Sequence, residues 1–291
     1  MHPDGRRTSN RSSRRSFLAA SAAAAVSGVG LGLGIYTWQV EPHWLEIVHR
    51  PLPIDGLPRA LHGCTLAQLS DIHVGTRVAD SYIASTFERV RGLAPDVIAY
   101  TGDFVSHHDE VFAHAERMYR DAPRGRLGTF GVFGNHDYGP AWSHPEMAER
   151  LGAILRDLGV RILQNEVDEV AGLQIAGMDD LWARRFDPVR TLAALDRHRP
   201  AIVLSHNPDT VDRPGWEPYS GWILSGHTHG GQCKPPFLPP PLLPVQNRRY
   251  TSGAFELEGE RRLYISRGVG HLTQVRFNVR PEVTIFELQK V

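Results

Sequence analysis

Five polar clusters carry the side chains of this sequence that are best suited to binding metal ions. Together they supply carboxylates, an amide oxygen and imidazole nitrogens. A mixed set of nitrogen and oxygen ligands suits Mn, Fe or Zn better than Mg or Ca, which prefer oxygen alone. The clusters are Asp71-Ile-His73, Gly102-Asp103, Gly134-Asn135-His136-Asp137, Ser205-His206 and Gly226-His227-Thr-His229.

Each cluster directly follows a short apolar run that is typical of a buried strand. In open α/β sheets, ligands gather at the carboxyl ends of the strands, so we expect the clusters to converge. Burying these polar side chains without partners would cost folding free energy, and two divalent cations would supply the missing partners. Within Asp71-x-His73 and His227-x-His229, an extended backbone would point both side chains the same way. The runs are 64–70, 96–101, 128–133, 201–204 and 221–224.

Helical and strand-like patterns alternate along most of the chain, which predicts an α/β sheet with helices outside it. We expect helices at 79–91, 110–120, 145–158 and 187–196. Further strands are predicted at 44–48, 161–163, 166–170 and 173–176, followed by antiparallel strands at 254–257, 263–266 and 283–288.

A proline-rich segment, residues 235–244, directly follows the His227–His229 cluster. It contains six prolines, so it is neither helix nor central strand. Two interpretations remain open: a surface linker, or a wall of the site.

The first forty residues resemble an export signal. Residues 17–38 carry no formal charge, and as a helix they would extend roughly 33 Å, enough to span a bilayer. The sequence Ser13-Arg14-Arg15-Ser16-Phe17-Leu18 just before them resembles the twin-arginine signal, which exports folded proteins. A cleaved signal and a retained membrane anchor both remain open.

Charge and cysteine content exclude two classes of protein. Residues 1–38 hold five Arg and one Asp, whereas the remainder holds 27 Lys and Arg against 31 Asp and Glu. A body of net charge −4 has no general attraction for a nucleic-acid backbone, so we expect no nucleic-acid partner. Two cysteines are too few for a disulfide scaffold.

The ordered clusters resemble the five motifs of the calcineurin-like metallophosphoesterases. The residues that carry the resemblance are Ser70-Asp71-Ile-His73, Thr101-Gly102-Asp103, Gly134-Asn135-His136-Asp137, Ser205-His206 and Ser225-Gly226-His227-Thr-His229-Gly-Gly. The resemblance implies a four-layer α/β/β/α sandwich of two mixed β-sheets with flanking helices. The leader, the tail Ser266-Arg267-Gly268 and the stretch 276–282 are similar to the exported bacterial YkuE-like branch.

The resemblance also implies a domain division and a metal centre. Residues 1–40 would be the signal or anchor, 41–60 a linker with the first strand, and 61–291 the metallophosphoesterase domain. Asp103 would bridge two divalent metals, and hydroxide held between the metals would be the nucleophile. One metal would be held by Asp71, His73, Asp103 and His229, and the other by Asp103, Asn135, His206 and His227.

The resemblance and the residue types also suggest catalytic and substrate-binding residues. His136 would protonate the leaving group or stabilise charge on the phosphoryl group, so His136 and Asp103 are the expected catalytic residues. Arg267 and Arg276 could bind a second phosphate or a lipid headgroup, or form structural ion pairs. His271 could face the substrate.

The expected activity is hydrolysis of a phosphoric ester or pyrophosphate at the cell envelope. Relatives of this kind suggest a lipid-linked substrate such as UDP-2,3-diacylglucosamine, a lipid A precursor, but phospholipid headgroups better fit an exported enzyme. The expected partners are a phosphorylated small molecule or lipid, the twin-arginine export machinery and the membrane. The alternative is a non-catalytic binding module on the same fold.

Two related families fit less well. After Asp103 the sequence lacks the Asp-Arg-Gly run of Ser/Thr protein phosphatases, and it lacks the tyrosine of purple acid phosphatases three residues later. DNA nucleases of this fold are disfavoured by the acidic body and the export signal.

Overall fold

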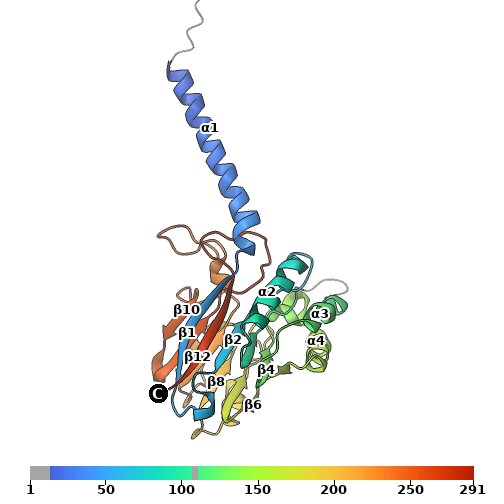
Figure 1. Cartoon of the computed structure of the whole chain (residues 1–291). Coiled ribbons are helices and arrows are strands. Elements are labelled where there is room, and N and C mark those ends of the chain that lie inside the picture. Colours follow the sequence, from blue (N-terminus) through green and yellow to red (C-terminus); the bar gives the residue numbers. More distant parts are fainter. Residues whose placement is uncertain (1–13, 107–110) are drawn as a thin grey trace, which may run out of the picture.

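The computed structural model describes residues 14–106 and 111–291, in which two six-stranded sheets pack face to face (Figure 1). Residues 1–13, which hold the start of the predicted export signal, lie outside the described ranges.

The first sheet is mixed and has the strand order β1-β12-β2-β3-β4-β5. Strands β2, β3, β4 and β5 run parallel to one another, β12 is antiparallel to β2, and β1 runs parallel to β12. The strands are β1 (Glu46–Ile54), β2 (Thr65–Leu69), β3 (Val97–Thr101), β4 (Gly128–Val132), β5 (Arg161–Ile162) and β12 (Glu282–Lys290).

The second sheet is also mixed and has the order β10-β11-β9-β8-β7-β6. Its four central strands are parallel, and the two edge strands, β6 and β10, are antiparallel to their neighbours. The strands are β6 (Glu166–Val170), β7 (Leu173–Gly177), β8 (Ala201–Leu204), β9 (Gly221–Ser225), β10 (Gly253–Glu256) and β11 (Arg261–Ile265).

Side-chain alternation along the central strands produces the layers. In β3, Val97 and Ala99 enter the core between the two sheets, whereas Ile98 and Tyr100 pack on the other face beneath the helices. In β9, Trp222 and Leu224 face the first sheet. Both sheets are therefore buried on both faces, as their nearly continuous apolar strands require.

Helices cover the outer faces of the sheets. On the first sheet lie α2 (Asp80–Gly92), α3 (Val111–Arg120) and α4 (Pro145–Asp157), and the second sheet is covered by α5 (Pro188–Ala193) with short turns and loops. The four-layer sandwich of two mixed sheets is thus confirmed. Helix α5 is shorter than the predicted 187–196: it begins at Pro188, because Asp187 accepts a hydrogen bond from the Arg190 amide as the N-cap, and it ends at Ala193.

The segment 41–60 contributes more than a linker to the domain. β1 is nine residues long, whereas we predicted a strand over 44–48, and it pairs with β12 along its whole length. The edge of the first sheet is therefore built by the two ends of the domain.

Helix α1 (Arg14–Ile35) projects away from the sheets, and further helical turns extend it to His43 (Figure 1). The stretch Phe17–His43 is long and apolar enough to cross a membrane, and a signal sequence meets the same criterion. By length and composition, the described N-terminal segment could serve as a signal or as an anchor.

Candidate metal centre

The five polar clusters meet in one place, as the strand-end argument predicts. Asp71 and His73 follow β2, Asp103 follows β3 and Asn135 follows β4, while His206 and the His227–His229 pair follow β8 and β9. All seven side chains are buried. The donor atoms of six of them form two groups, each within 4.8 Å: Asp71, His73 and His229 in one, and Asp103, His206 and His227 in the other.

In the first group, neighbouring imidazole nitrogens and carboxylate oxygens lie within about 3.5 Å of one another. The Nε2 atoms of His73 and His229 are 3.2 Å apart, and Nε2 of His229 lies 3.4 Å from Oδ1 of Asp71. Nε2 of His73 is also 3.5 Å from Oδ2 of Asp103.

In the second group, Nε2 of His206 lies 3.2 Å from Nδ1 of His227 and 3.2 Å from Oδ2 of Asp103. The same Asp103 oxygen therefore faces both groups. This is the geometry that a bridging carboxylate needs.

Backbone carbonyls select which histidine nitrogens are free to bind a metal. His206 donates its Nδ1 proton to the Thr101 carbonyl at 2.7 Å, and His227 donates its Nε2 proton to the Pro244 carbonyl at 2.8 Å. These hydrogen bonds leave Nε2 of His206 and Nδ1 of His227 facing each other, where each can bind a metal once it carries no proton. Metal-binding histidines are commonly oriented by such outer hydrogen bonds.

The residues present fit divalent cations. Nε2 of His206 and Nδ1 of His227 are 3.2 Å apart, so two lone pairs there would repel each other, and either a proton or a cation must lie between the nitrogens. Among the described residues, neither Oδ1 nor Nδ2 of the fully buried Asn135 has a hydrogen-bond partner. An amide oxygen without a donor is costly when buried, and a hard or borderline cation would satisfy it.

The backbone at the ligands is strained, which differs from the extended backbone that we expected. Five of the seven ligand residues have positive φ angles, between 48° and 70°: Asp71, His73, Asp103, His227 and His229. Non-glycine residues rarely adopt this conformation, and it is tolerated mainly where the surroundings hold it for function. The sharp turns bring Asp71 and His73 into one donor group and divide His227 and His229 between the two groups.

A glycine lets the two sheets approach at this point. A Cβ atom at Gly134 would lie 2.2 Å from Oδ1 of Asp103 and 2.7 Å from Nε2 of His206. Any side chain at Gly134 would therefore displace two proposed ligands.

Burial and mutual charge shift the pKa values of the site in opposite directions. Burial raises the pKa of Asp71 to about 6 and lowers those of His73 and His227 to about 3. Burial also opposes protonation of His206, but the Asp103 carboxylate outweighs it and raises the pKa of His206 to about 10. The same attraction holds the pKa of Asp103 well below its usual value, against the effect of burial.

His136 lies at the edge of the centre, only partly buried. Its ring packs edge-on against His73 with the centroids 5.2 Å apart, and its backbone N–H donates to Oδ1 of Asp103 at 2.9 Å. Asp137 accepts the Gly134 and Val105 amides and so fixes the turn that carries His136. A group at the rim of a metal pair is placed to meet substrate.

The comparison with known families agrees with this geometry. Residues 64–231 match the profile of the calcineurin-like phosphoesterases, which is more than half of the chain. The chain belongs to the calcineurin-like metallophosphoesterases. It is therefore a hydrolase acting on phosphoric esters, and the family typically uses a dinuclear metal centre.

Several characterised and uncharacterised proteins resemble this metallophosphoesterase over nearly its whole length. Phosphodiesterase YaeI of Escherichia coli is 34% identical, with 95% of this chain and 99% of the relative covered. Metallophosphoesterase YkuE of Bacillus subtilis is 30% identical, with 95% and 98% covered. UDP-2,3-diacylglucosamine pyrophosphatase LpxG of Chlamydia muridarum is 26% identical, with 86% and 92% covered.

Arg267 and His271, which we expected to contact substrate, both make internal contacts in the structure. Arg267 forms ion pairs with Glu282 and, at 2.9 Å, with Glu46. His271 is buried and donates its Nε2 proton to the Arg77 carbonyl at 3.2 Å. Of the two interpretations of Arg267, structural pairing is the one that the structure shows.

Arg276 is likewise structural and entirely buried. Its guanidinium donates to the carbonyls of Val279, Arg267, Gly268 and Gly270, and the nearest of these, Gly270, is 2.7 Å away. The Gly270 amide in turn donates to the Asp71 carbonyl at 2.7 Å. In this structure Arg276 therefore positions the loop behind a proposed metal ligand.

Replacing Arg276 with methionine is expected to lower the free energy of unfolding by about 3 kcal/mol, because several buried carbonyls lose their donor. For a domain of this size that corresponds to a fall in Tm of roughly 6–12 °C, measured by thermal denaturation. Arg197→Met at an exposed arginine is the matched control and should change Tm little. An unchanged Tm in Arg276→Met would contradict the structural role.

The sequence analysis missed three residues beside the centre. The ring of Trp182 packs edge-on against His227 with the centroids 4.4 Å apart, and Trp142 packs on Trp182. Asp180 is buried close to His206, and burial raises its pKa to about 6. Asp180 could have been found from the sequence, because the polar residues Asp179 and Asp180 follow β7 as the other polar clusters follow their strands.

The proline-rich segment 235–244 is a wall of the site, which decides between the two interpretations left open. Its last residue, Pro244, accepts the proton of His227. A Cβ atom at Gly231 would lie 2.3 Å from Pro240, so the loop packs directly on the turn after His229.

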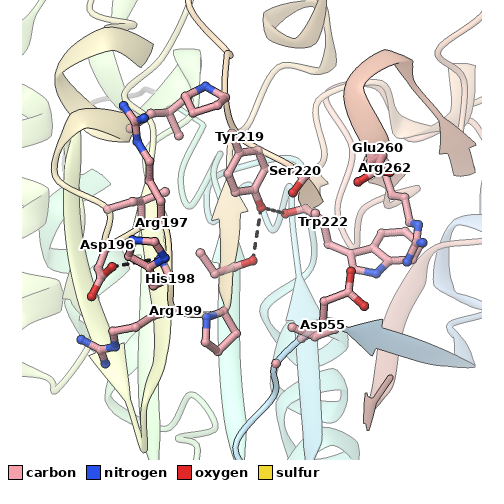
Figure 2. A pocket seen from close by; sticks show the side chains of 18 of the residues that line it. Asp55, Asp196, Arg197, His198, Arg199, Tyr219, Ser220, Trp222, Glu260 and Arg262 are labelled. Carbon is pink, nitrogen blue, oxygen red and sulfur yellow. Dashed lines mark hydrogen bonds between the residues drawn. The ribbon is translucent and has the colours of Figure 1, made fainter.

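A cavity of about 580 Å³ opens away from the metal centre (Figure 2). It lies where β8 and β9 begin, whereas the proposed ligands follow the ends of these strands. Tyr219 at its floor donates to the Trp222 carbonyl at 2.8 Å. None of the seven proposed ligands lines this cavity, so it is separate from the centre.

Proposed function

We propose that this metallophosphoesterase uses two divalent cations, Mn, Fe or Zn, to hydrolyse a phosphodiester or pyrophosphate of a lipid-linked substrate at the cell-envelope membrane. The observation that carries the proposal is the pair of donor groups joined through one oxygen of Asp103. A pair of sites sharing a carboxylate suits a phosphoryl group, whose attacking and leaving oxygens must both be stabilised.

The ligands are divided between the two cations as the family resemblance implies. Asp71, His73, Asp103 and His229 would hold one, and Asp103, Asn135, His206 and His227 the other. When bound, the cations would supply Lewis acidity for the phosphoryl oxygens and lower the pKa of a water molecule.

The residues of the chain itself would orient the substrate and move a proton. His136 stands at the rim, where its ring can donate a proton to the departing oxygen or a hydrogen bond to the phosphoryl group. Trp142 and Trp182 cover the side of His227 and shield that side of the centre from water.

Two observations support a lipid-linked substrate. The chain has an N-terminal helix long enough to cross a membrane. One relative, LpxG, is named for a pyrophosphatase that acts on a diacylated nucleotide sugar, and another, YaeI, for a phosphodiesterase. Export by the twin-arginine route would place the enzyme outside the cytoplasm, where phospholipid headgroups are the available phosphodiesters.

The test starts from the purified full chain stripped of metal by a chelator. Addition of Mn should restore hydrolysis of bis-p-nitrophenyl phosphate, with Zn and Fe as further arms. Envelope phospholipids and UDP-2,3-diacylglucosamine are then offered, and the products are identified by mass. Absence of turnover with every metal would overturn the proposal in favour of the binding module.

A further inference from the structure

An exposed apolar loop stands out on the surface of the domain. We call residues 234–249 the rim loop. Its tip exposes Phe237 completely, and Leu238 and Leu242 are 59% and 80% exposed. Large apolar side chains grouped on a solvent-exposed surface usually mark a site of contact with a protein or a membrane.

The backbone holds the rim loop close to the end of the N-terminal helix. The Lys234 amide donates to the Phe277 carbonyl at 2.9 Å, and the neighbouring Arg276 amide donates to the Thr37 carbonyl at 3.0 Å. Gln274 also donates to the Trp38 carbonyl at 2.8 Å. Phe237 is three residues beyond Lys234, which is roughly 10 Å of extended chain. Figure 1 shows loops of the domain gathered around the lower end of α1.

The charges of the rim loop suit an anionic surface. Between Pro218 and Glu256 the sequence has no acidic residue. Lys234, Arg248 and Arg249 are exposed on the loop, flanking the apolar tip. A cluster of cations beside exposed apolar side chains is the pattern of a segment that lies in the interface of an anionic membrane.

The end of α1 also has the features of a membrane interface. Trp38 and Trp44 are about half exposed where the apolar stretch meets the domain. Tryptophan is enriched at the level of the lipid headgroups because its ring is amphipathic. The bilayer surface would therefore lie at the height of Thr37 and Trp38, to which the segment next to the rim loop is bonded.

We propose that the rim loop is a second membrane contact, which inserts Phe237, Leu238 and Leu242 into the headgroup region of the bilayer that α1 enters. The occupant of this apolar surface is the lipid, because the surface is continuous with the only described helix that could cross a membrane. One anchor leaves a domain free to tilt, whereas two contacts fix its orientation.

Such an orientation bears on the metal centre, and this consequence rests on the proposed function. Pro244, two residues after Leu242 in the rim loop, supplies the carbonyl that orients His227. The same loop would thus contact the bilayer through its exposed apolar side chains and the centre through the Pro244 carbonyl. A phosphate linked to a lipid would then reach the centre from the membrane surface without leaving the bilayer.

The experiment uses the full chain reconstituted into liposomes of phosphatidylcholine and phosphatidylglycerol, with a lipid that carries a photoreactive diazirine in its acyl chain. After irradiation and digestion, crosslinked peptides are identified by mass spectrometry. Peptides of α1 serve as the internal reference. We expect crosslinks on the rim loop, and crosslinks on α1 without enrichment of the rim loop over α5 would overturn the proposal.

A double variant sharpens the result. Phe237→Asp with Leu242→Asp should reduce rim-loop crosslinking by roughly ten-fold, because carboxylates oppose insertion, while α1 crosslinking persists. Val189→Asp, at a 67% exposed valine of α5, is the matched control and should leave crosslinking unchanged. Equal rim-loop crosslinking in the double variant and the wild type would also overturn the proposal. The readout needs no turnover, so its failure is distinguishable from failure of the proposed hydrolase activity.

Discussion

Asp103→Asn is expected to lower kcat for bis-p-nitrophenyl phosphate by at least about 10³-fold, which corresponds to ~4 kcal/mol of activation free energy. The reason is that one Asp103 oxygen lies 3.5 Å from His73 and 3.2 Å from His206, and so serves both donor groups. Removing its charge weakens both cation sites together. Steady-state kinetics with added Mn measures the loss.

Metal content provides a second readout for the same variant. We expect the wild type to bind two metals per chain and Asp103→Asn to bind fewer, as measured by mass spectrometry of the bound elements. Asp121→Asn makes the same chemical change at an exposed aspartate and should keep both metals and the activity. Full activity in Asp103→Asn would contradict the bridging role.

His136→Ala should lower kcat by about 10²–10⁴-fold, the range expected for loss of a general acid, without changing the metal content. The ring lies at the rim beside His73, and it is not one of the donors that form the two groups. The two substitutions are therefore expected to separate chemistry from metal binding.

The leaving group tests the role of His136 further. p-Nitrophenolate departs without a proton, whereas an alkoxide such as that from phosphatidylglycerol needs one. A proton donor at residue 136 predicts a greater loss for the lipid than for bis-p-nitrophenyl phosphate. Equal losses would indicate charge stabilisation on the phosphoryl group instead. His144→Gln, at an exposed histidine, is the matched control.

Strand ends were the most informative feature of the sequence. Short apolar runs followed by Asp, Asn or His predicted which residues would meet: Asp71 does meet His229, and Asp103 does meet His227. The prediction succeeds because parallel strands place their carboxyl ends on one edge, whatever their distance along the chain. The backbone conformation at these residues was predicted wrongly, because positive φ angles at Asp71 and His73 depend on the packed surroundings.

The arginines show what a sequence pattern leaves undetermined. Arg267 and Arg276 carry the right chemistry for phosphate, but their partners are set by tertiary contacts. Arg276 is surrounded by four carbonyls that the fold brings together, and Arg267 lies between two glutamates, one of them in β1. Single charges near a site are therefore weaker signals than sets of ligands at strand ends.

Each donor group draws residues from both sheets: Asp71 and His73 with His229, and Asp103 with His206 and His227. Bound cations would thus link the two sheets of the sandwich through shared ligands. The chain passes from one sheet to the other between β5 and β6 and returns only with β12. A polypeptide cut at that crossing would yield two fragments, neither of which could hold a complete ligand set until they reassembled.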